Sequence, residues 1–322
     1  MIARYDLAPL DGITKTVFRR VWNDRFGGAD RYFIPFFSPT SEHVMTARDL
    51  KELDRSRNVG LDLVPQVMTR RAADFLWAAE VVKDLGYTEV NLNLGCPSGT
   101  VAGKGKGSGF LARPEELERF FDEVFAGTPL PVSVKTRLGI TDPEEFQPIL
   151  EIYNRYPIAC LTIHPRVQKE FYKGEVHLDA FARALAESRN PVCYNGELKT
   201  VEEIRAFEER FPTVDAVMIG RGAIGDPALL RKVRGGKAAS REELQAFIQD
   251  LYRSYQDFYG GQAAQAAQRM KEVWYYLIRL FQGGERIDRR LRRTRNPREY
   301  EMLEAAIFAE LPLLDHIPVS LA

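Results

Sequence analysis

Eight short apolar segments with the pattern of strands occupy the first two thirds of the chain, and amphipathic helical patterns stand between them. This alternation predicts a parallel sheet, because helices must connect parallel strands and cover the faces of the sheet. Eight such units in roughly 230 residues fit a (β/α)8 TIM barrel, which typically needs ~250 residues. The predicted strands are Arg4–Pro9, Tyr32–Phe37, Leu61–Val67, Glu89–Leu94, Val132–Thr136, Cys160–His164, Val192–Asn195 and Asp215–Ile219. The clearest predicted helices between them are Ala72–Leu85, Pro114–Phe125, Pro143–Tyr153 and Val201–Arg210.

A doubly wound open sheet is the rival architecture. It usually has fewer strands and a glycine fingerprint after the first one, whereas here the first strand runs into Ala8-Pro9-Leu10-Asp11-Gly12. The barrel also makes a sharper prediction, since its active site collects polar residues from the carboxyl ends of several strands. The sequence agrees with this prediction, because polar residues recur at the carboxyl ends of the predicted strands, and the first residues of successive groups are 26 to 42 positions apart. The tips are Gln66, Asn93 with Cys96, Lys135 with Arg137, His164 with Arg166, Asn195, and Arg221.

The segment Glu89–Pro97 predicts a reactive position at one of these tips. Val90, Leu92 and Leu94 alternate with two asparagines, as in a buried strand, and Gly95 and Pro97 end it. Cys96 is therefore expected at the mouth of a loop. A glycine-rich stretch carrying Lys104 and Lys106 follows, and we expect a mobile, cationic loop suited to closing over an anion. The alternative is a buried structural cysteine beside a surface loop.

Composition excludes several classes of protein. The 45 basic and 45 acidic residues cancel, so only the distribution of charge bears on nucleic-acid binding. Three cysteines without metal-type spacing predict a reducing compartment and no metal site, and Cys160 and Cys193 are expected in the core. No apolar run approaches the ~20 residues that span a bilayer. We expect a cytoplasmic protein without a signal peptide, and a monomer because no segment has the pattern of a dimer interface.

Beyond residue 240 the pattern is helical only. A linker around Gly235–Ser240 separates a barrel domain over residues 1–233 from a small helical domain over 240–322, with helices expected at Arg241–Tyr259, Ala263–Phe281 and Glu299–Leu311. Gly284–Arg298 carries seven arginines against two acidic residues, which is typical either of a solvated face or of a phosphate-binding surface.

Taken in order, these motifs resemble the tRNA-dihydrouridine synthases, and the resemblance to their bacterial members covers nearly the whole chain. The family is an FMN-binding TIM barrel followed by a helical RNA-binding domain, and it reduces uridine in tRNA to dihydrouridine with NADPH as electron donor. The motifs that carry the resemblance are Ala8–Gly12, Gln66-Val67, Asn93–Pro97 with its glycine-rich loop, Lys135–Arg137, His164–Arg166, Asn195–Glu197 and Gly220–Ala223.

The resemblance implies roles for single residues. Pro9, Leu10 and Asp11 would line the flavin; Gln66, Lys135 and His164 would hydrogen-bond its ring; Asn195, Gly196, Gly220 and Arg221 would hold the ribityl phosphate. Glu197 would also belong to the cofactor site. Asn93, Arg137, Lys104, Lys106 and Arg166 would contact the RNA, and Cys96 would be the catalytic acid. The chemistry agrees, because uracil receives a hydride at C6 and a proton at C5, and a thiol of ordinary pKa, about 8.5, is protonated near pH 7. The stretch Arg269–Leu280 resembles the family's domain-packing helix, with its aromatic residues mostly in the core and one exposed to RNA.

One motif departs from the family pattern. A glycine and a threonine usually flank the arginine of this motif, whereas here Pro165 and Val167 do, and Pro165 supplies no backbone N–H. Three other functions are weighed against the leading one: a flavin barrel acting on a free pyrimidine, as dihydroorotate-type enzymes do; the same reduction on ribosomal RNA; and a non-catalytic RNA-binding protein. The basic helical tail argues against the first, and the set of flavin motifs argues against the last.

Overall fold

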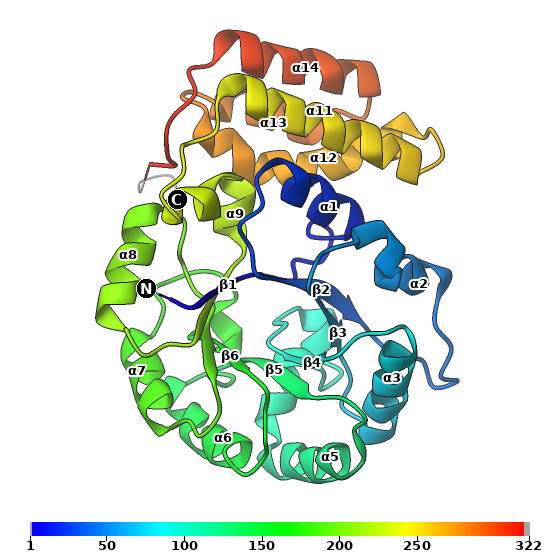
Figure 1. Ribbon diagram of the computed structural model, residues 1–322, viewed down its shortest axis with the longest axis vertical. Helices are drawn as coiled ribbons and strands as arrows, with labels where there is room; N and C mark the ends of the chain where they lie inside the picture. The colour runs from blue at the N-terminus through cyan, green and yellow to red at the C-terminus, as the bar shows by residue number, and fades with distance from the viewer. Residues whose placement is uncertain (1, 319–322) are drawn as a thin grey trace. The chain divides into compact units, whose positions relative to one another are not determined.

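A closed barrel of eight parallel strands forms the first part of the protein, in a computed structural model that describes residues 2–318. Neighbouring strands follow chain order, so each pairs with the next one along the sequence. All eight predicted strands are confirmed, with ends that differ by at most two residues (Figure 1). They are β1 (Arg4–Leu7), β2 (Arg31–Phe37), β3 (Leu63–Val67), β4 (Val90–Leu94), β5 (Val132–Arg137), β6 (Leu161–His164), β7 (Val192–Tyr194) and β8 (Ala216–Ile219).

Alternate residues of each strand face the barrel interior, as the twofold period of a strand requires. The apolar part of this interior is a cluster from four strands and from the residues next to β1 and β6: Ala8, Phe33, Val64, Cys160, Cys193, Ala216 and Met218. Cys160 is 2% exposed and Cys193 is fully buried, which confirms both cysteines as core residues. The interior is therefore packed rather than open, and polar groups lie beyond this cluster toward the two ends.

Ion pairs gather near the amino ends of the strands. Arg4 Nε lies 2.9 Å from an Asp6 carboxylate oxygen, and Arg31 Nη1 lies 2.8 Å from Glu89. Asp6 is fully buried, and burial raises the pKa of its carboxyl to about 6, although the Arg4 guanidinium acts in the opposite direction. A buried carboxylate costs free energy even when it is paired, so this cluster closes the barrel at some expense of stability.

The first compact unit of the chain contains the barrel strands and the helices on their outer side (Figure 1). It comprises the residues up to Pro9, Arg31–Glu197 and Arg210–Met218. Aromatic side chains join neighbouring outer helices, as where Phe75 meets Phe120 edge to face at 6.0 Å. The helices are α2 (Ala47–Leu53), η1 (Arg55–Asn58), α3 (Ala72–Asp84), α4 (Gly99–Ala102), η2 (Gly107–Ala112), α5 (Pro114–Gly127), η3 (Pro143–Glu145), α6 (Phe146–Tyr153), η4 (Gln168–Glu170) and α7 (Leu178–Glu187).

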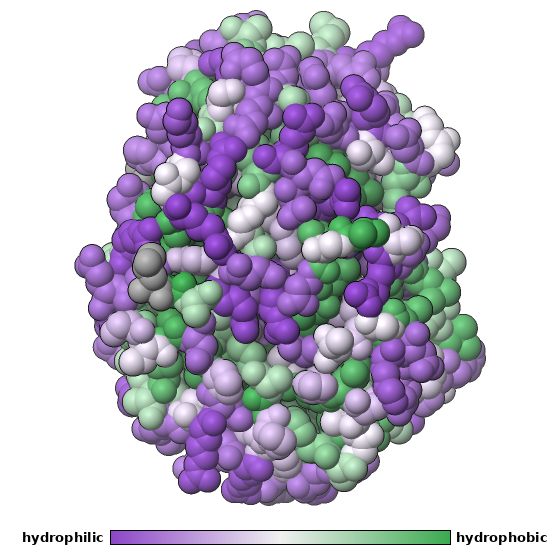
Figure 2. All heavy atoms as spheres, in the orientation of Figure 1, coloured by the Kyte–Doolittle hydropathy of each residue, from purple (hydrophilic) through white to green (hydrophobic). Residues whose placement is uncertain are grey.

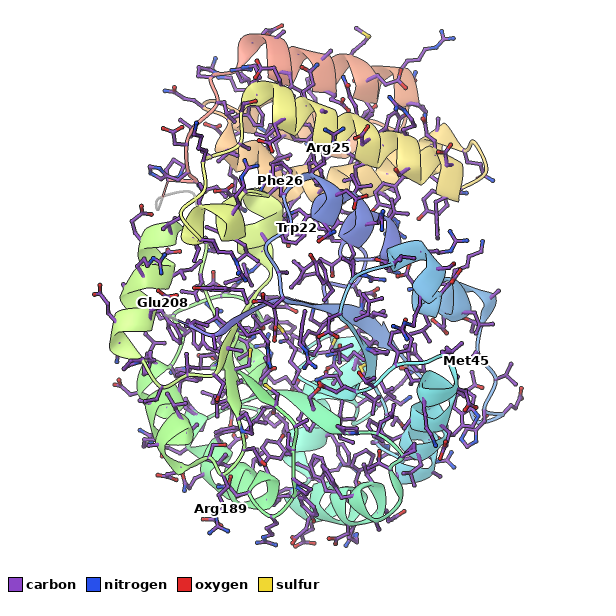
Figure 3. All side chains as sticks on the ribbon, viewed as in Figure 1. Trp22, Arg25, Phe26, Met45, Arg189 and Glu208 are labelled. Atoms are coloured by element: carbon purple, nitrogen blue, oxygen red, sulfur yellow. The ribbon has the colours of Figure 1, made fainter. Side chains whose placement is uncertain are left out.

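The second compact unit is helical and contains Leu10–Asp30, Leu198–Glu209 and the chain from Ile219 onward. Within it, α1 packs along α11: Phe26 lies 5.2 Å from Phe247 edge to face, and Arg25 Nε donates to Asp250 at 2.9 Å (Figure 3). The Trp22 indole donates to the Pro227 carbonyl at 3.1 Å. Its helices are α1 (Thr16–Arg25), α8 (Val201–Arg210), α9 (Arg221–Gly225), α10 (Leu229–Val233), α11 (Arg241–Phe258), α12 (Ala263–Leu277), η5 (Ile278–Leu280), α13 (Glu285–Arg293) and α14 (Pro297–Glu310). The domain division at residues 233 and 240 stays a prediction.

Helix α12 explains the aromatic run that the sequence places there. Trp274 is fully buried, with its indole nitrogen 3.2 Å from Tyr300 Oη and its ring 5.8 Å from Phe308. Tyr275 points outward and is 43% exposed. Tyr276 is half-buried, so the expectation that these aromatic residues lie mostly in the core is wrong, whereas the expectation of one exposed aromatic residue is confirmed.

Two segments are more ordered than the sequence suggests. The glycine-rich stretch after Cys96, expected as a mobile loop, forms α4 and η2, because its glycines let the backbone pack closely on itself; a Cβ at Gly109 would lie 2.3 Å from the Ala102 carbonyl oxygen. The arginine-rich segment forms α13, where Leu291 is the buried residue, so no apolar stripe announces the helix.

No helix among residues 2–318 is both long and apolar enough to cross a membrane. Hydrophilic side chains cover much of the face drawn in Figure 2, and hydrophobic ones form small groups between them. This distribution is ordinary for a protein surface in water.

The pKa of Asp6 predicts a pH dependence of stability. The unfolded carboxyl titrates near pH 4 and the folded one near pH 6, so the folded state binds the extra proton between these values. We expect Asp6 to lower the free energy of unfolding by about 1 kcal/mol between pH 5 and pH 7, since one pKa unit corresponds to about 1.4 kcal/mol. Urea unfolding at both pH values checks this. Asp6→Asn should lack this decrease. An equal change in the free energy of unfolding between pH 5 and pH 7 in both proteins would show that Asp6 does not cause it.

Candidate active site at the carboxyl end of the barrel

The strand register brings several of the predicted polar tips together. Asn93 of β4 is paired with Lys135 of β5, and Arg137 of β5 is paired with His164 of β6. Partners in register on parallel strands point to the same side of the sheet, so these four side chains share the inner face. They come near the carboxyl ends of their strands, where barrel enzymes place their chemistry.

A buried amide network lies beneath this set. Gln66 Nε2 donates to Asn91 Oδ1 at 2.7 Å, and Gln66 Oε1 accepts from Asn93 Nδ2 at 2.7 Å. Asn91 Nδ2 in turn donates to Ser133 Oγ at 2.9 Å. Three strands are therefore tied together by side chains whose orientations are mutually fixed. Sequence reasoning passed over Asn91 and Ser133, although the alternation of asparagines in β4 already placed Asn91 on the same face as Asn93.

Asn93 also holds the turn that carries Cys96. Its Oδ1 accepts hydrogen bonds from the backbone N–H groups of Gly95 and Cys96, both at 3.0 Å. This is an asparagine turn, in which the side chain replaces a backbone acceptor. With both ends of its amide engaged, Asn93 fixes the position of Cys96.

The segment after Cys96 folds back against it. The Cys96 carbonyl accepts from Ser108 Oγ at 2.9 Å and from the Ser108 N–H at 3.1 Å. Gly107 has φ 55°, and a Cβ there would lie 2.8 Å from the same carbonyl oxygen, so a larger residue does not fit. Cys96 stays half-buried beneath this cover, while Lys104 is exposed and Lys106 half-buried.

Lys135 is a half-buried cation without a counter-charge. Among residues 2–318 no carboxylate forms an ion pair with its amine and no side chain accepts a hydrogen bond from it. Burial lowers the pKa of Lys135 to about 8, and the nearby Arg137 guanidinium lowers it further in the same direction. The amine is thus mostly protonated at neutral pH in a place that favours an anionic or strongly polar ligand.

Arg137 is buried and anchored to backbone. Its Nε donates to the Gly95 carbonyl at 2.9 Å and its Nη1 to the Val167 carbonyl at 3.1 Å. The guanidinium also stands over the ring of Tyr172, 5.2 Å from its centroid, and Tyr172 is 52% exposed. Tyr172 is thus a site residue that the predicted set lacks, although Tyr172 and Gly174 keep the downstream part of the family's sequence pattern after His164.

His164, Arg166 and Glu197 form one contact group. Arg166 Nη1 lies 3.1 Å from His164 Nε2 and 2.9 Å from a Glu197 carboxylate oxygen, and Nη2 donates to the Gly174 carbonyl at 2.6 Å. The Arg166 side chain is 2% exposed, so its guanidinium faces protein rather than solvent. The carboxylate of Glu197, a predicted cofactor residue, is paired with this arginine.

Asn195 and Gly196 follow β7. Asn195 Nδ2 donates to the Met218 carbonyl at 2.7 Å, which links the ends of β7 and β8. The Tyr194 hydroxyl fills the space beside the Gly196 Cα: a Cβ at this position would lie only 2.0 Å from Tyr194 Oη, so only glycine fits here.

The other predicted cofactor residues lie at the start of the second unit or beside it in sequence. Pro9 ends the segment after β1; the Leu10 N–H donates to Thr14 Oγ1 at 2.7 Å, and Asp11 lies 3.3 Å from Lys15. Gly220 directly precedes α9, whose first residue is Arg221. Their roles toward a cofactor stay predictions.

No group of three or more His, Cys, Asp or Glu side chains within the described part of the chain is placed to hold a metal ion. This end of the barrel brings together one thiol, three buried or half-buried cations, an imidazole and a set of amides: Cys96, Lys135, Arg137, Arg166, His164, Gln66, Asn91 and Asn93.

Comparison with known proteins shows which family the chain matches. The family "Dihydrouridine synthase (Dus)" matches residues 6–309. A "Probable tRNA-dihydrouridine synthase 2" of Bacillus subtilis is 29% identical over 92% of this chain and 91% of its own length. A "tRNA-dihydrouridine(16) synthase" of Ralstonia nicotianae is 32% identical over 74% of each chain.

Solved structures support the fold alone. Morphinone reductase matches 74% of this chain and 87% of its own with a TM-score of 0.52 at 14% identity. Histamine dehydrogenase from Rhizobium sp. 4-9 matches 78% of this chain and 49% of its own, with a TM-score of 0.54 at 12% identity. Because the family match spans nearly the whole chain, this chain belongs to the dihydrouridine synthase family and is an enzyme.

Proposed function

We propose that this enzyme reduces the C5–C6 double bond of specific uridines in tRNA, with FMN as its bound cofactor and NADPH as the electron donor. The observation that carries the proposal is that a thiol held in a fixed position lies at the same end of the barrel as a cation without a counter-charge. Asn93 fixes the turn of Cys96, and the Asn93 strand partner, Lys135, faces the same interior without a counter-charge. Family membership and the names of the relatives in Bacillus subtilis and Ralstonia nicotianae support the substrate.

The residues at the barrel mouth fit a flavin. A half-buried lysine without an anionic partner suits the polar edge of a ring that gains negative charge on reduction. Asn195 and Gly196 directly follow β7, in the region where TIM barrels often bind phosphate. When bound, FMN supplies the hydride that uracil receives at C6. Gln66, Lys135 and His164 would hold its ring; Pro9, Leu10, Asp11, Asn195, Gly196, Glu197, Gly220 and Arg221 are the other residues that we assign to it.

Cys96 supplies the proton. A hydride at C6 leaves negative charge that the proton at C5 neutralises, and the donor must be protonated at working pH and close to C5. The asparagine turn sets the backbone of Cys96, and Gly107 and Ser108 cover its far side. Arg137 is held by two backbone carbonyls and lies over the ring of Tyr172. We assign contacts with the uracil to the Arg137 guanidinium and to the exposed ring of Tyr172.

The RNA contact rests on α13 and the residues just after it. All seven arginines of this stretch are exposed, and Arg286, Arg289, Arg293, Arg295 and Arg298 form no ion pair with the residues the structure describes. Exposed cations without internal partners are available to phosphates, whereas a merely solvated face is usually laced with ion pairs. Arg166, by contrast, is buried and paired, so we assign RNA contacts to Lys104, Lys106 and α13 in preference to it.

Replacing Cys96 tests the reaction. We expect Cys96→Ala to lower the single-turnover rate of dihydrouridine formation about 100-fold or more, since a general acid typically contributes 10²–10⁴-fold. The flavin spectrum of the purified variant should be unchanged. The measurement mixes enzyme reduced with NADPH in the absence of oxygen with unmodified tRNA and follows flavin reoxidation and the dihydrouridine product.

Ser98→Ala, two residues further on at an exposed position, is the matched control and should react like the parent. A Cys96→Ala rate equal to that of the parent would remove Cys96 from the acid role. Reoxidation by ribosomal RNA or free uracil, but not by tRNA, would transfer the activity to those substrates.

Lys135 predicts a pH profile. Because the pKa of Lys135 lies at about 8, its charge is present below that pH and is lost above it. We expect the single-turnover rate to fall as pH rises from 7 to 9. The Cys96 thiol also loses its proton toward the upper end of this range, so Lys135→Arg, whose guanidinium stays charged, should show a smaller fall than the parent, and Lys135→Met should be slow throughout. The same fall in the arginine variant would assign it to another group.

The arginines of α13 predict a salt dependence. Arg289 and Arg293 lie one helical turn apart, and we expect Arg289→Gln with Arg293→Gln to reduce the log–log slope of tRNA affinity against salt by about two, roughly one for each phosphate contact. Filter binding from 50 to 300 mM salt measures the slope. Arg119→Gln with Arg189→Gln removes two exposed arginines from the barrel unit and should leave it unchanged. Equal slopes in both double variants would exclude α13 from the interface.

A further inference from the structure

Arg166 makes a contact that constrains the chemistry of His164. Its Nη1 lies 3.1 Å from His164 Nε2, and both side chains are buried. A guanidinium is always protonated in proteins and has only N–H donors, so it cannot accept a hydrogen bond. The His164 Nε2 must therefore be the acceptor, with its lone pair directed at Arg166 and no proton of its own.

Two alternatives fail on the same geometry. An imidazolium would carry a proton on Nε2 and place one N–H donor against another at 3.1 Å. A ring turned by half a rotation would put a C–H group where Nε2 now lies, and the buried Nη1 would lose this acceptor. The neutral ring with its proton on Nδ1 satisfies the contact.

The arginine is itself held from two other sides. Glu197 pairs with the same Nη1 at 2.9 Å, and the Gly174 carbonyl accepts from Nη2 at 2.6 Å. The main chain adds a further constraint, because the Arg166 N–H donates to the His164 carbonyl at 2.7 Å. Arg166 therefore has little freedom to turn away from His164.

The same contacts tie His164 to the loop that carries Tyr172. Tyr172 stacks on the His164 ring at 6.2 Å with 26° between the planes, and Gly174, two residues on, receives the Arg166 hydrogen bond. His164, Arg166 and this loop thus form one unit, and a change in the loop reaches the imidazole through Arg166.

We propose that Arg166 is a positioning residue that fixes His164 as the Nδ1–H tautomer, so that His164 offers a hydrogen-bond donor, and not an acceptor, to the ligand at the barrel mouth. The inference rests on the proposed function for the identity of that ligand, whose facing atom must be an acceptor such as a ring oxygen or nitrogen of FMN. Arg166 acts through His164 and does not itself need to touch the ligand or the RNA.

Ring ¹⁵N NMR of the full chain with labelled histidine and saturating FMN tests the tautomer directly. The chain has four histidines, and comparison with His164→Gln assigns the signal of interest. We expect a protonated Nδ1 and an unprotonated Nε2 for His164 in the parent protein at pH 7.5. The reverse pattern, or a ring protonated on both nitrogens, would overturn the proposal without any variant.

The variants test the cause. In Arg166→Met we expect His164 to move to the Nε2–H form or to a mixture, and the Kd for FMN to rise about tenfold; Arg166→Lys should restore the Nδ1–H form in part, because an ammonium also donates. Arg189→Met removes an exposed arginine and should change neither signal. An unchanged tautomer in a folded Arg166→Met protein would refute the role of Arg166.

The two layers of inference fail separately. A locked Nδ1–H tautomer in a protein that binds FMN but leaves tRNA unreduced would keep the role of Arg166 and reject the proposed reaction. Active reduction of tRNA by a protein whose His164 carries its proton on Nε2 would support the proposed reaction and reject the role of Arg166.

Discussion

The side chain of Asn93 joins the interior of the barrel to its reactive end. One end of its amide is bonded to Gln66, and the other receives the backbone of Gly95 and Cys96. A buried hydrogen bond adds about 1 kcal/mol to the free energy of unfolding, but a buried polar group left without a partner costs about 1–3 kcal/mol. Loss of one of these bonds should therefore weaken the others. The position of the thiol is consequently set by the registration of β3, β4 and β5, rather than by the loop on which the thiol lies.

The two ends of the barrel treat charge in opposite ways. Near the amino ends, Arg4 and Arg31 are matched with Asp6, Asp62 and Glu89, and the charges close the barrel. At the carboxyl end, Arg166 is paired with Glu197, but Lys135 has no counter-charge among residues 2–318, and Arg137 contacts two carbonyls and the Tyr172 ring. An unmatched charge in a half-buried place costs stability until a ligand compensates it, which is the arrangement expected of a binding site. The cations at the amino ends are therefore compensated within the protein, whereas the Lys135 amine at the carboxyl end is not.

Much of this was predictable from local patterns. Strand alternation located all eight strands, and the end of β1 was predicted two residues too far, at Pro9, a residue without an N–H that cannot extend a ladder. One polar residue per strand end indicated the site because parallel strands must bring these ends together. What escaped prediction depends on contacts between distant residues.

Arg166 and Glu197 illustrate that limit, since they are 31 positions apart and their ion pair gives no local signal. The glycines after Cys96 suggested a mobile loop because glycine frees the backbone, yet Gly107 and Gly109 are needed for close packing. Helix α1 was missed for a similar reason: Arg19 is fully buried, donates to the Thr14 carbonyl, and interrupts the apolar stripe by which such a helix is recognised.

The cations assigned to RNA binding and those assigned to the reaction differ in their exposure to solvent. The arginines of α13 are exposed, so dissolved salt screens them within about 8 Å at physiological ionic strength. Lys135 and Arg137 lie half-buried or buried, where screening by salt is much weaker. Salt should therefore act on how often tRNA is bound and much less on how fast a bound uridine is reduced. A single-turnover rate at saturating tRNA that fell with salt as steeply as the affinity does would show that the same charges serve both steps, contrary to their placement in this structure.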